Sequence, residues 1–183
     1  MALQGKLSHP KRFITTTNDE GQAIIDRESV PADLPFYDVA QDDAAFATCY
    51  ATDKFPVDIG DSSDINTYKL FLQKPPGLTV STGTVLRYVD IPPGMTSAMH
   101  KTVSLDYGVV LEGHVELVLD SGDTQVMERG DICIQRATMH AWRNVSYTEW
   151  ARMLYILQPA QSSTAGHDLR EDYGGMKGVE ASK

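Results

Sequence analysis

The sequence predicts an all-β domain, an antiparallel β-barrel preceded by an extended N-terminal arm. From Tyr68 onward, short apolar runs recur between turns rich in Gly, Pro and Asp, and this spacing is typical of a sandwich or barrel of antiparallel strands. Before Tyr68 the pattern is mixed. We therefore assign residues 1–66 to the arm, 67–160 to the barrel and 161–183 to a flexible tail that is polar and Gly-rich. The apolar runs are residues 68–72, 79–91, 107–111, 115–119, 125–127, 132–135 and 151–157.

The arm contains its own structural signals. Residues 12–17 are β-branched, and the turn-forming residues 18–21 lead into residues 22–25, which can return as a second strand. Residues 42–50 predict a short helix capped by Asp42. An extended arm of this kind often pairs with a sheet edge, either of its own barrel or of a second copy. We therefore expect a homodimer.

Composition narrows the class of protein. The chain has 183 residues, of which 42% are hydrophobic and 22% charged, and this is enough for one globular domain with a sizeable core. The net charge of -9 argues against a nucleic-acid partner, because no basic stripe is available to neutralise phosphates. Cys49 and Cys133 are too few for a disulfide framework, and no stretch reads as a signal peptide or membrane span. We expect a cytoplasmic protein with no membrane partner.

Two segments carry most of the chemical information, residues 94–113 (GMTSAMHKTVSLDYGVVLEG) and 130–144 (GDICIQRATMHAWRN). Each places a histidine beside an apolar strand pattern and a glycine turn. Together they resemble the two sequence motifs of the cupin family, and the resemblance covers roughly residues 79–158. In the first motif the matching residues are Gly94, His100 and Gly113, while Thr102 stands where the family has a second histidine and Asp106 where it has a glutamate.

The second motif matches the family at Gly130, His140 and Asn144, whereas Gln135 and Ala137 replace its turn residues. The resemblance implies a double-stranded β-helix, or jelly roll, whose lumen holds a metal or a small molecule. The surrounding sequence is similar to small single-domain cupins of fungal and bacterial secondary-metabolite pathways. Membership of that group implies a small-molecule substrate.

Three residues are the candidate catalytic groups: His100, His140 and Asp106. Side chains alternate along a strand, so His100 and Thr102 share a face, which by the family's geometry is the lumen. Two imidazoles and a carboxylate can hold one divalent metal such as Fe, Zn or Mn. Threonine is a poor ligand and aspartate is shorter than glutamate, so a metal-free site stays open. In that case the histidines would titrate near neutrality as an acid–base pair, with Asp106 orienting one imidazole.

Four residues are candidates for substrate binding. Thr102 can donate a hydrogen bond. Trp142 alternates onto the face of His140, where it would either stack on a planar substrate or join the core. Tyr107 could hold an oxyanion, although alternation places it opposite Asp106 and we favour Asp106 as the lumenal residue. Arg87 would bind a carboxylate or enolate if it faces the lumen. Otherwise it would lie on the polar, solvent-facing side of its strand.

The residues and the resemblance together predict an enzyme of biosynthetic, polyketide-like metabolism. Its reaction would be a proton transfer such as dehydration, isomerisation, cyclisation or decarboxylation, which makes it a lyase or an isomerase. One alternative is an oxidoreductase, a non-haem iron oxygenase that uses His100, His140 and Asp106 as a two-histidine, one-carboxylate site. The other is a non-catalytic cupin that binds a small ligand.

Overall fold

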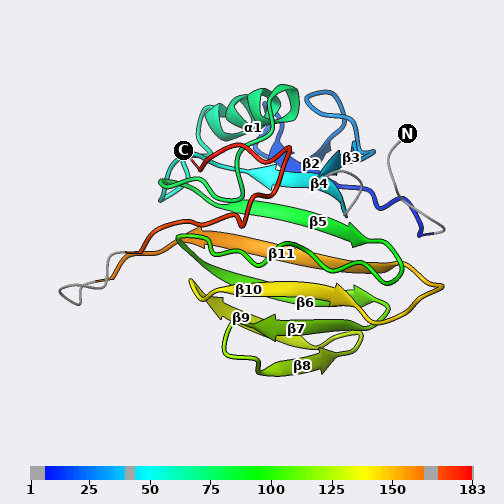
Figure 1. Ribbon diagram of the computed structural model, residues 1–183. Helices are drawn as coiled ribbons and strands as arrows, with labels where there is room; N and C mark the ends of the chain where they lie inside the picture. The colour runs from blue at the N-terminus through cyan, green and yellow to red at the C-terminus, as the bar shows by residue number, and fades with distance from the viewer. Residues whose placement is uncertain (1–6, 40–43, 163–168, 183) are drawn as a thin grey trace.

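The computed structural model describes residues 7–39, 44–162 and 169–182, and within them the chain folds into a barrel of antiparallel strands (Figure 1). One wall is a six-stranded sheet of β3 (Tyr37–Val39), β4 (Ala44–Ala51), β5 (Val85–Ile91), β11 (Ala151–Pro159), β6 (Ser104–Glu112) and β9 (Ile132–Arg136), in that order. The other is a three-stranded sheet of β10 (His140–Asn144), β7 (Val115–Leu119) and β8 (Thr124–Met127). The predicted all-β jelly-roll class is confirmed.

Alternation along the strands produces the core. In β6 the buried residues Ser104, Asp106 and Val110 point inward, and Leu105 and Tyr107 between them are only partly buried. The opposite sheet contributes Val115 and Trp142, and these two residues belong with Val110 to one hydrophobic cluster that also includes Val85 and Met153. The lumen is therefore mostly apolar, and polar side chains within it stand out.

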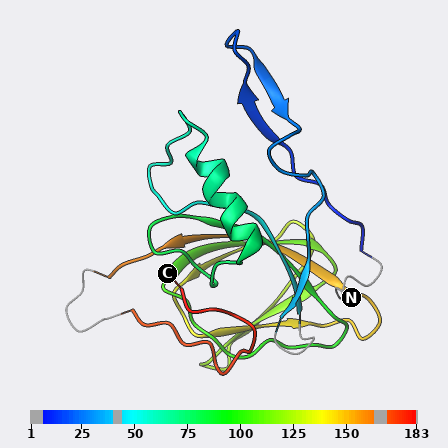
Figure 2. The same ribbon diagram turned by 90° about the horizontal axis from the view of Figure 1, so that it is seen from above.

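The N-terminal hairpin was predicted correctly. Strand β1 (Ile14–Thr17) pairs with β2 (Ala23–Asp26), and Asn18 closes the turn by accepting hydrogen bonds on its side chain. Figure 2 shows this hairpin projecting away from the barrel. Further along the predicted arm, β3 and β4 pair into the six-stranded sheet next to β5, so this part of the chain extends the barrel's own sheet.

Two sequence predictions of secondary structure are wrong. Residues 44–51 form strand β4 rather than a helix: the run is mostly apolar, its consecutive residues are buried on both faces of the sheet, and β3 and β5 pair with its two edges. Asp42, the expected cap, lies outside the described residues. Residues 68–72 belong to helix α1 (Ser63–Gln73) rather than to a barrel strand. Ile65 and Tyr68 are buried at helical spacing, so this face packs against the barrel.

The C-terminal segment differs from the expected loose tail. Residues 169–182 return along the barrel, where Lys101 and Asp172 exchange two backbone hydrogen bonds of 2.6 and 2.8 Å. Near the end of the chain, Thr79 Oγ1 donates a hydrogen bond of 2.7 Å to Ser182 Oγ. We call residues 169–182 the C-terminal strap. It is the red segment that crosses in front of β5 and β4 in the view of Figure 1.

No helix within the described part of the chain is long and apolar enough to cross a bilayer.

Candidate active site

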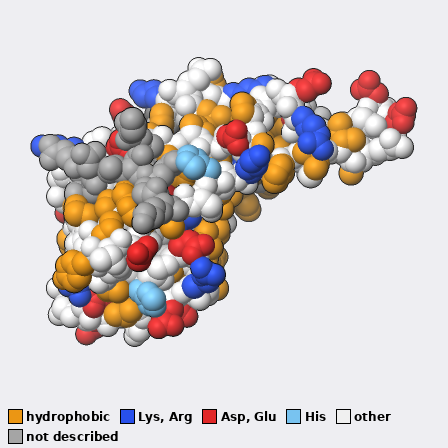
Figure 3. All heavy atoms as spheres, turned by 90° about the vertical axis from the view of Figure 1, so that its right-hand side faces the viewer, with side chains coloured by type: hydrophobic (Ala, Val, Ile, Leu, Met, Phe, Trp, Pro, Cys, Tyr) orange, Lys and Arg blue, Asp and Glu red, His pale blue; other side chains and the backbone are white. Residues whose placement is uncertain are grey.

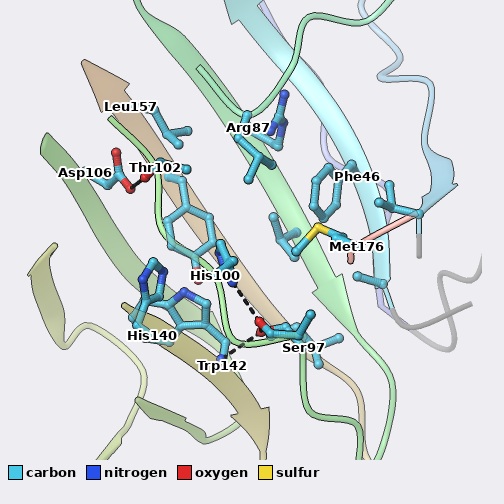
Figure 4. A pocket seen from close by; sticks show the side chains of 17 residues that line it. Phe46, Arg87, Ser97, His100, Thr102, Asp106, His140, Trp142, Leu157 and Met176 are labelled. Atoms are coloured by element: carbon cyan, nitrogen blue, oxygen red, sulfur yellow. Dashed lines mark hydrogen bonds between the residues drawn. The ribbon is translucent and has the colours of Figure 1, made fainter. Parts of the chain in front are cut away.

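A cavity lies inside the barrel between the two sheets, and its lining combines an apolar wall with a few polar groups (Figure 4). It holds about 750 Å³ of empty space, counted out to its open mouth. The apolar wall comes chiefly from β4, β5, β11 and the strap: Phe46, Val89, Ile91, Leu157 and Met176. The polar side chains are those of Arg87, Ser97, His100, Thr102, Asp106 and His140.

The two motif histidines meet in this cavity, as predicted. The segment that carries His100 pairs with the start of β10 through mutual backbone hydrogen bonds between His100 and His140, of 2.8 and 2.9 Å. The two rings consequently lie 4.3 Å apart between centroids, with planes tilted by 46°. Both side chains are buried, with residue exposures of 8% for His100 and 2% for His140. Two sequence segments forty residues apart therefore present their imidazoles as one pair.

Backbone carbonyls orient both imidazoles. His100 Nδ1 lies 2.8 Å from the carbonyl oxygen of Ala98, and His140 Nδ1 lies 2.9 Å from that of Thr138. A neutral ring that donates from Nδ1 keeps its Nε2 lone pair free. The side-chain amide nitrogen of Gln135, which is a donor, lies 2.9 Å from the same Nδ1 of His140, so it bonds to this ring only in the tautomer that carries the proton on Nε2. Asp106 does not orient an imidazole, so that expectation is wrong.

The electrostatics of the pair also differ from the expectation of titration near neutrality. Burial lowers the pKa of His100 below its ordinary value. Burial, together with the neighbouring charge of a protonated His100, lowers the pKa of His140 to about 4. Both rings are therefore neutral at pH 7 and can accept a proton, whereas neither is held as an imidazolium acid.

Asp106 supplies the group that titrates nearer neutrality. Asp106 is 4% exposed, and burial raises the pKa of its carboxyl to about 6. Thr102 Oγ1 donates to Asp106 Oδ2 at 3.3 Å and accepts a hydrogen bond from Ser104 Oγ at 2.8 Å. The other carboxyl oxygen, Oδ1, is buried and has no hydrogen-bond partner among the described residues. Thr102 and Asp106 thus form one polar edge of the cavity.

Tyr107 points away from this cavity, which bears out the preference for Asp106 as the inward residue. Its backbone is paired with Ile134 on one side and Ile156 on the other, and it is not among the lining residues. A role for Tyr107 as an oxyanion donor in the lumen is therefore wrong. The reason is the regular alternation of β6, which has no bulge between Asp106 and Tyr107.

Arg87 and Trp142 both face the lumen. Arg87 is 2% exposed, so the solvent-facing alternative is wrong; its Nη2 donates to the carbonyl oxygen of Gly77 at 2.8 Å. Trp142 presents its edge to His140, with centroids 5.6 Å apart, and also packs 5.7 Å from the ring of Tyr155. Trp142 is thus both a cavity wall and a core residue.

The donor set does not fit a three-ligand metal centre. Within residues 7–39, 44–162 and 169–182, no group of three or more His, Cys, Asp or Glu side chains is placed to hold one ion. His100 and His140 lie together, but Asp106 is bonded to Thr102 at the other edge of the cavity (Figure 4). Thr102, which stands where the family has a histidine, supplies no strong ligand. The expected two-histidine, one-carboxylate cluster is therefore not assembled in this structure.

Two residues were not anticipated as site residues from the sequence: Gln135, which lies beside His140, and Met176, which lines the cavity. Gln135 could have been found, because alternation in β9 turns it inward beside the second motif. Met176 could not, because it comes from the strap, which has no periodic pattern. Asn144 was recognised as a motif residue, and its side-chain amide donates to the carbonyls of Ile91, Pro92 and Glu149. It anchors the loops below the cavity.

Comparison with known proteins adds relatives from fungal gene clusters. The chain is 46% identical to phomopsin biosynthesis cluster protein C' of Diaporthe leptostromiformis, over 85% of this chain and 82% of that protein. It is 37% identical to oryzines biosynthesis cluster protein J of Aspergillus oryzae, over 91% and 92% of the two chains. It is 38% identical to a cupin-domain-containing oxidoreductase of Aspergillus ruber, over 82% and 73%.

No model of a known protein family matches the sequence. Among solved structures, the polyketide cyclase RemF from Streptomyces resistomycificus is 18% identical, with a TM-score of 0.42 over 69% of this chain and 75% of that one. A likeness at this level leaves the reaction open.

Proposed function

Because the chain belongs to the cupin-domain proteins, with relatives in fungal biosynthesis clusters, we propose that it is a biosynthetic enzyme that moves a proton on a small molecule inside its barrel. The reaction class is isomerisation, dehydration, cyclisation or decarboxylation. One observation carries this proposal: two neutral imidazoles and a carboxyl whose pKa is about 6 line the same apolar cavity. Groups that exchange protons near the working pH are effective general acids and bases.

The arrangement allows one edge of the cavity to remove a proton from the substrate while the other edge delivers or accepts a second proton. A free Nε2 of His100 or His140 accepts a proton from an activated C–H bond of the substrate. Asp106 either donates its carboxyl proton to another atom of the substrate or accepts one from a hydroxyl. The atoms balance without an oxidant: in isomerisation or cyclisation the proton removed from one position returns at another, in dehydration it departs with the hydroxyl as water, and in decarboxylation CO₂ leaves and a proton takes its place on carbon. The apolar wall does not stabilise additional charged groups or water in the cavity, so protons are exchanged between the substrate and these three residues rather than with solvent.

A second candidate is oxidation or reduction of the substrate, favoured by the name of the Aspergillus ruber relative. Such a reaction removes or adds two electrons and therefore needs an electron acceptor or donor in addition to the residues described above. The product would differ in mass from the substrate by two hydrogens or by oxygen. That difference separates the two candidates without any assumption about cofactors.

The test uses the intermediate that accumulates when the gene for this protein is deleted in its producing organism. The purified protein is incubated with that intermediate in D₂O, once in air and once without oxygen. A proton-transfer enzyme gives the same product in both, with no net oxidation, and an isomerase or decarboxylase also incorporates solvent deuterium at carbon. An oxygen-dependent reaction or an oxidised product would instead support the second candidate, and an unchanged intermediate that binds tightly would indicate a binding protein.

Variants of the histidines assign the roles. We expect His100→Ala and His140→Ala each to lower kcat at least about 100-fold, the usual contribution of a positioned acid or base. His114→Ala is the matched control, because His114 is exposed on the turn between β6 and β7. Circular dichroism confirms that each variant is folded. Full turnover in both cavity variants would remove the histidine pair from the mechanism.

A further inference from the structure

Two arginines are buried in neighbouring strands of the six-stranded sheet, and only one of them has a carboxylate partner. Arg152 of β11 is 4% exposed and binds Asp90 through two hydrogen bonds of 2.6 Å each. Arg87 of β5 is 2% exposed and lines the cavity. No carboxylate of the described residues lies within ion-pair distance of it. The sheet thus contains one internally neutralised arginine and one that is not.

The contacts of Arg87 leave most of its hydrogen-bonding capacity unused. Nη2 donates to the carbonyl oxygen of Gly77, and the guanidinium lies over the ring of Phe46, 5.0 Å from its centroid. Nε is buried and has no hydrogen-bond partner among the residues that the structure describes. A guanidinium has five N–H donors in a planar fork that matches a carboxylate. Holding this charge in an apolar interior without an anion is unfavourable.

A complementary acceptor faces the same cavity. Asp106 Oδ1 is buried and has no partner among the described residues, while Oδ2 is occupied by Thr102. Figure 4 shows Arg87 and Asp106 on separate strands across the cavity, with Leu157 between them in the view and the histidines at the opposite end. The cavity therefore offers an unused cationic donor and an unused acceptor that are not bonded to each other.

We propose that Arg87 binds a carboxylate group of the substrate, which assigns the substrate class as a hydroxylated carboxylic acid on an apolar skeleton. The carboxylate pairs with the free N–H groups of Arg87, a hydroxyl donates to Asp106 Oδ1, and the skeleton lies against Phe46 and Trp142. This inference rests on the proposed function only in placing the substrate in the same cavity. It makes no use of the histidines.

Access to Arg87 is not confined to the lumen. Arg87 and Phe46 also line a second cavity of about 520 Å³, which is formed with Tyr37, residues 74–76 and residues 178–180 of the strap. Its other charged side chains are Lys74 and Glu180. Arg87 thus lines two hollow spaces.

The test compares two probes that differ in charge and hardly in shape, 2-hydroxybenzoate and 2-hydroxybenzamide. Their affinities for the full chain are measured by isothermal titration calorimetry at neutral pH. We expect the wild-type protein to bind the acid at least about tenfold more tightly than the amide. Arg87→Met should lose this preference, Arg87→Lys should keep part of it, and Arg129→Met should behave like wild type because Arg129 is exposed.

Several outcomes would overturn the inference. These are equal affinities for acid and amide in the wild type, an unchanged preference in Arg87→Met, or no binding of the acid up to about 10 mM. The comparison of probes on the unmodified protein remains decisive if an Arg87 variant does not fold. His114→Ala, at an exposed turn outside the cavity, should bind the acid as the wild type does. A protein in which the acid binds but the histidine variants keep full turnover would contradict the proposed function and leave this inference standing.

Discussion

Asp106 shows how a single buried carboxyl couples stability to pH. Its pKa is 3.8 in the unfolded chain and about 6 in the folded protein, because burial penalises the carboxylate. The folded state therefore binds the proton more tightly. The resulting stabilisation is fully present below pH 3.8 and is lost as the pH rises through about 6. Above that pH the ionised side chain opposes folding by roughly 3 kcal/mol, at about 1.4 kcal/mol per pKa unit.

Replacing this carboxyl with a neutral amide should consequently stabilise the protein, but only where Asp106 is ionised. We expect Asp106→Asn to raise the free energy of unfolding by roughly 1–3 kcal/mol near pH 8, and to have little effect near pH 4. Urea denaturation at both pH values measures this. Asp123→Asn, at an exposed turn, is the matched control. A variant that is less stable than wild type near pH 8 would mean that the Asp106 carboxylate has a stabilising partner in the fold.

At the same scale, sequence reasoning found the histidine pair and the inward Asp106 because motif spacing and alternation determine them. The sequence does not determine whether Arg87 faces the lumen or the solvent. Alternation places a residue on one of the two faces of its strand, but it does not show which of those faces is the lumen. Sequence reasoning also expected the histidines to titrate near neutrality, since the degree of burial is not visible in a sequence. The partner of each Nδ1 is a backbone carbonyl two residues earlier, which depends on local geometry rather than on residue type.

At the scale of elements, the strap determines one side of the cavity. Gly174 is held at φ +58°, and a Cβ built on it would lie 2.1 Å from the carbonyl oxygen of Met99. Two residues later, Met176 reaches the cavity lining. We expect Gly174→Ala to displace the strap from the segment before His100. Affinity for a cavity ligand should then fall, and proteolytic cleavage within residues 169–182 should become faster.

Gly175→Ala is the matched control for that prediction. Gly175 has φ +80°, so both substitutions strain the backbone, but a Cβ at Gly175 would meet no atom within 4 Å. Backbone strain alone costs about 1–2 kcal/mol. Limited proteolysis followed by mass spectrometry compares the two variants with wild type. Equal cleavage of Gly174→Ala and Gly175→Ala would show that the close approach to Met99 does not hold the strap.

Elements were predicted where local patterns and tertiary structure agree. Most strands from β5 onward have turns and apolar runs that identify them, and the β1–β2 hairpin has a clear turn at Asn18, whereas β10 was not among the predicted runs because its buried residues do not alternate. Strand β4 was mistaken for a helix because its apolar run lacks period-two alternation, and this follows from burial on both faces. The strap contains no such pattern. Its position depends on long-range contacts such as those of Asp172 and Ser182, which a sequence does not reveal.

At the scale of the whole molecule, the outer face of the six-stranded sheet is unusually apolar. Residues that alternate with the inward ones on β6, β9 and β11 are partly or largely exposed, and backbone pairing brings them side by side. They include Ile132 and Ile134, which are 63% and 50% exposed. An antiparallel sheet that faces water usually shows polar residues on its outer side. The apolar outer residues are Leu105, Tyr107, Val109, Ile132, Ile134, Leu154 and Ile156.

The homodimer expected from the sequence remains a prediction, and this face is where we expect two copies to meet. The face includes Tyr107, which the alternation of β6 turns away from the cavity. The β1–β2 hairpin offers further apolar side chains, with Phe13, Ile24 and Ile25 exposed on the projection that Figure 3 shows beside the barrel. A symmetric contact of one apolar face with its copy would remove both surfaces from water.

Light scattering coupled to size-exclusion chromatography measures the mass in solution, and we expect a dimer of the 20.2 kDa chain. Ile134→Glu places a charge at the centre of the expected contact, so it should yield a folded monomer, because an unpaired buried charge is strongly unfavourable in an interface. Ile59→Glu is the control, since Ile59 is 77% exposed and lies outside this sheet. A wild-type monomer at about 50 µM would contradict the prediction, because stable interfaces have dissociation constants well below that concentration. A dimer that Ile134→Glu leaves intact would instead place the contact elsewhere, with the β1–β2 hairpin as the next surface to alter.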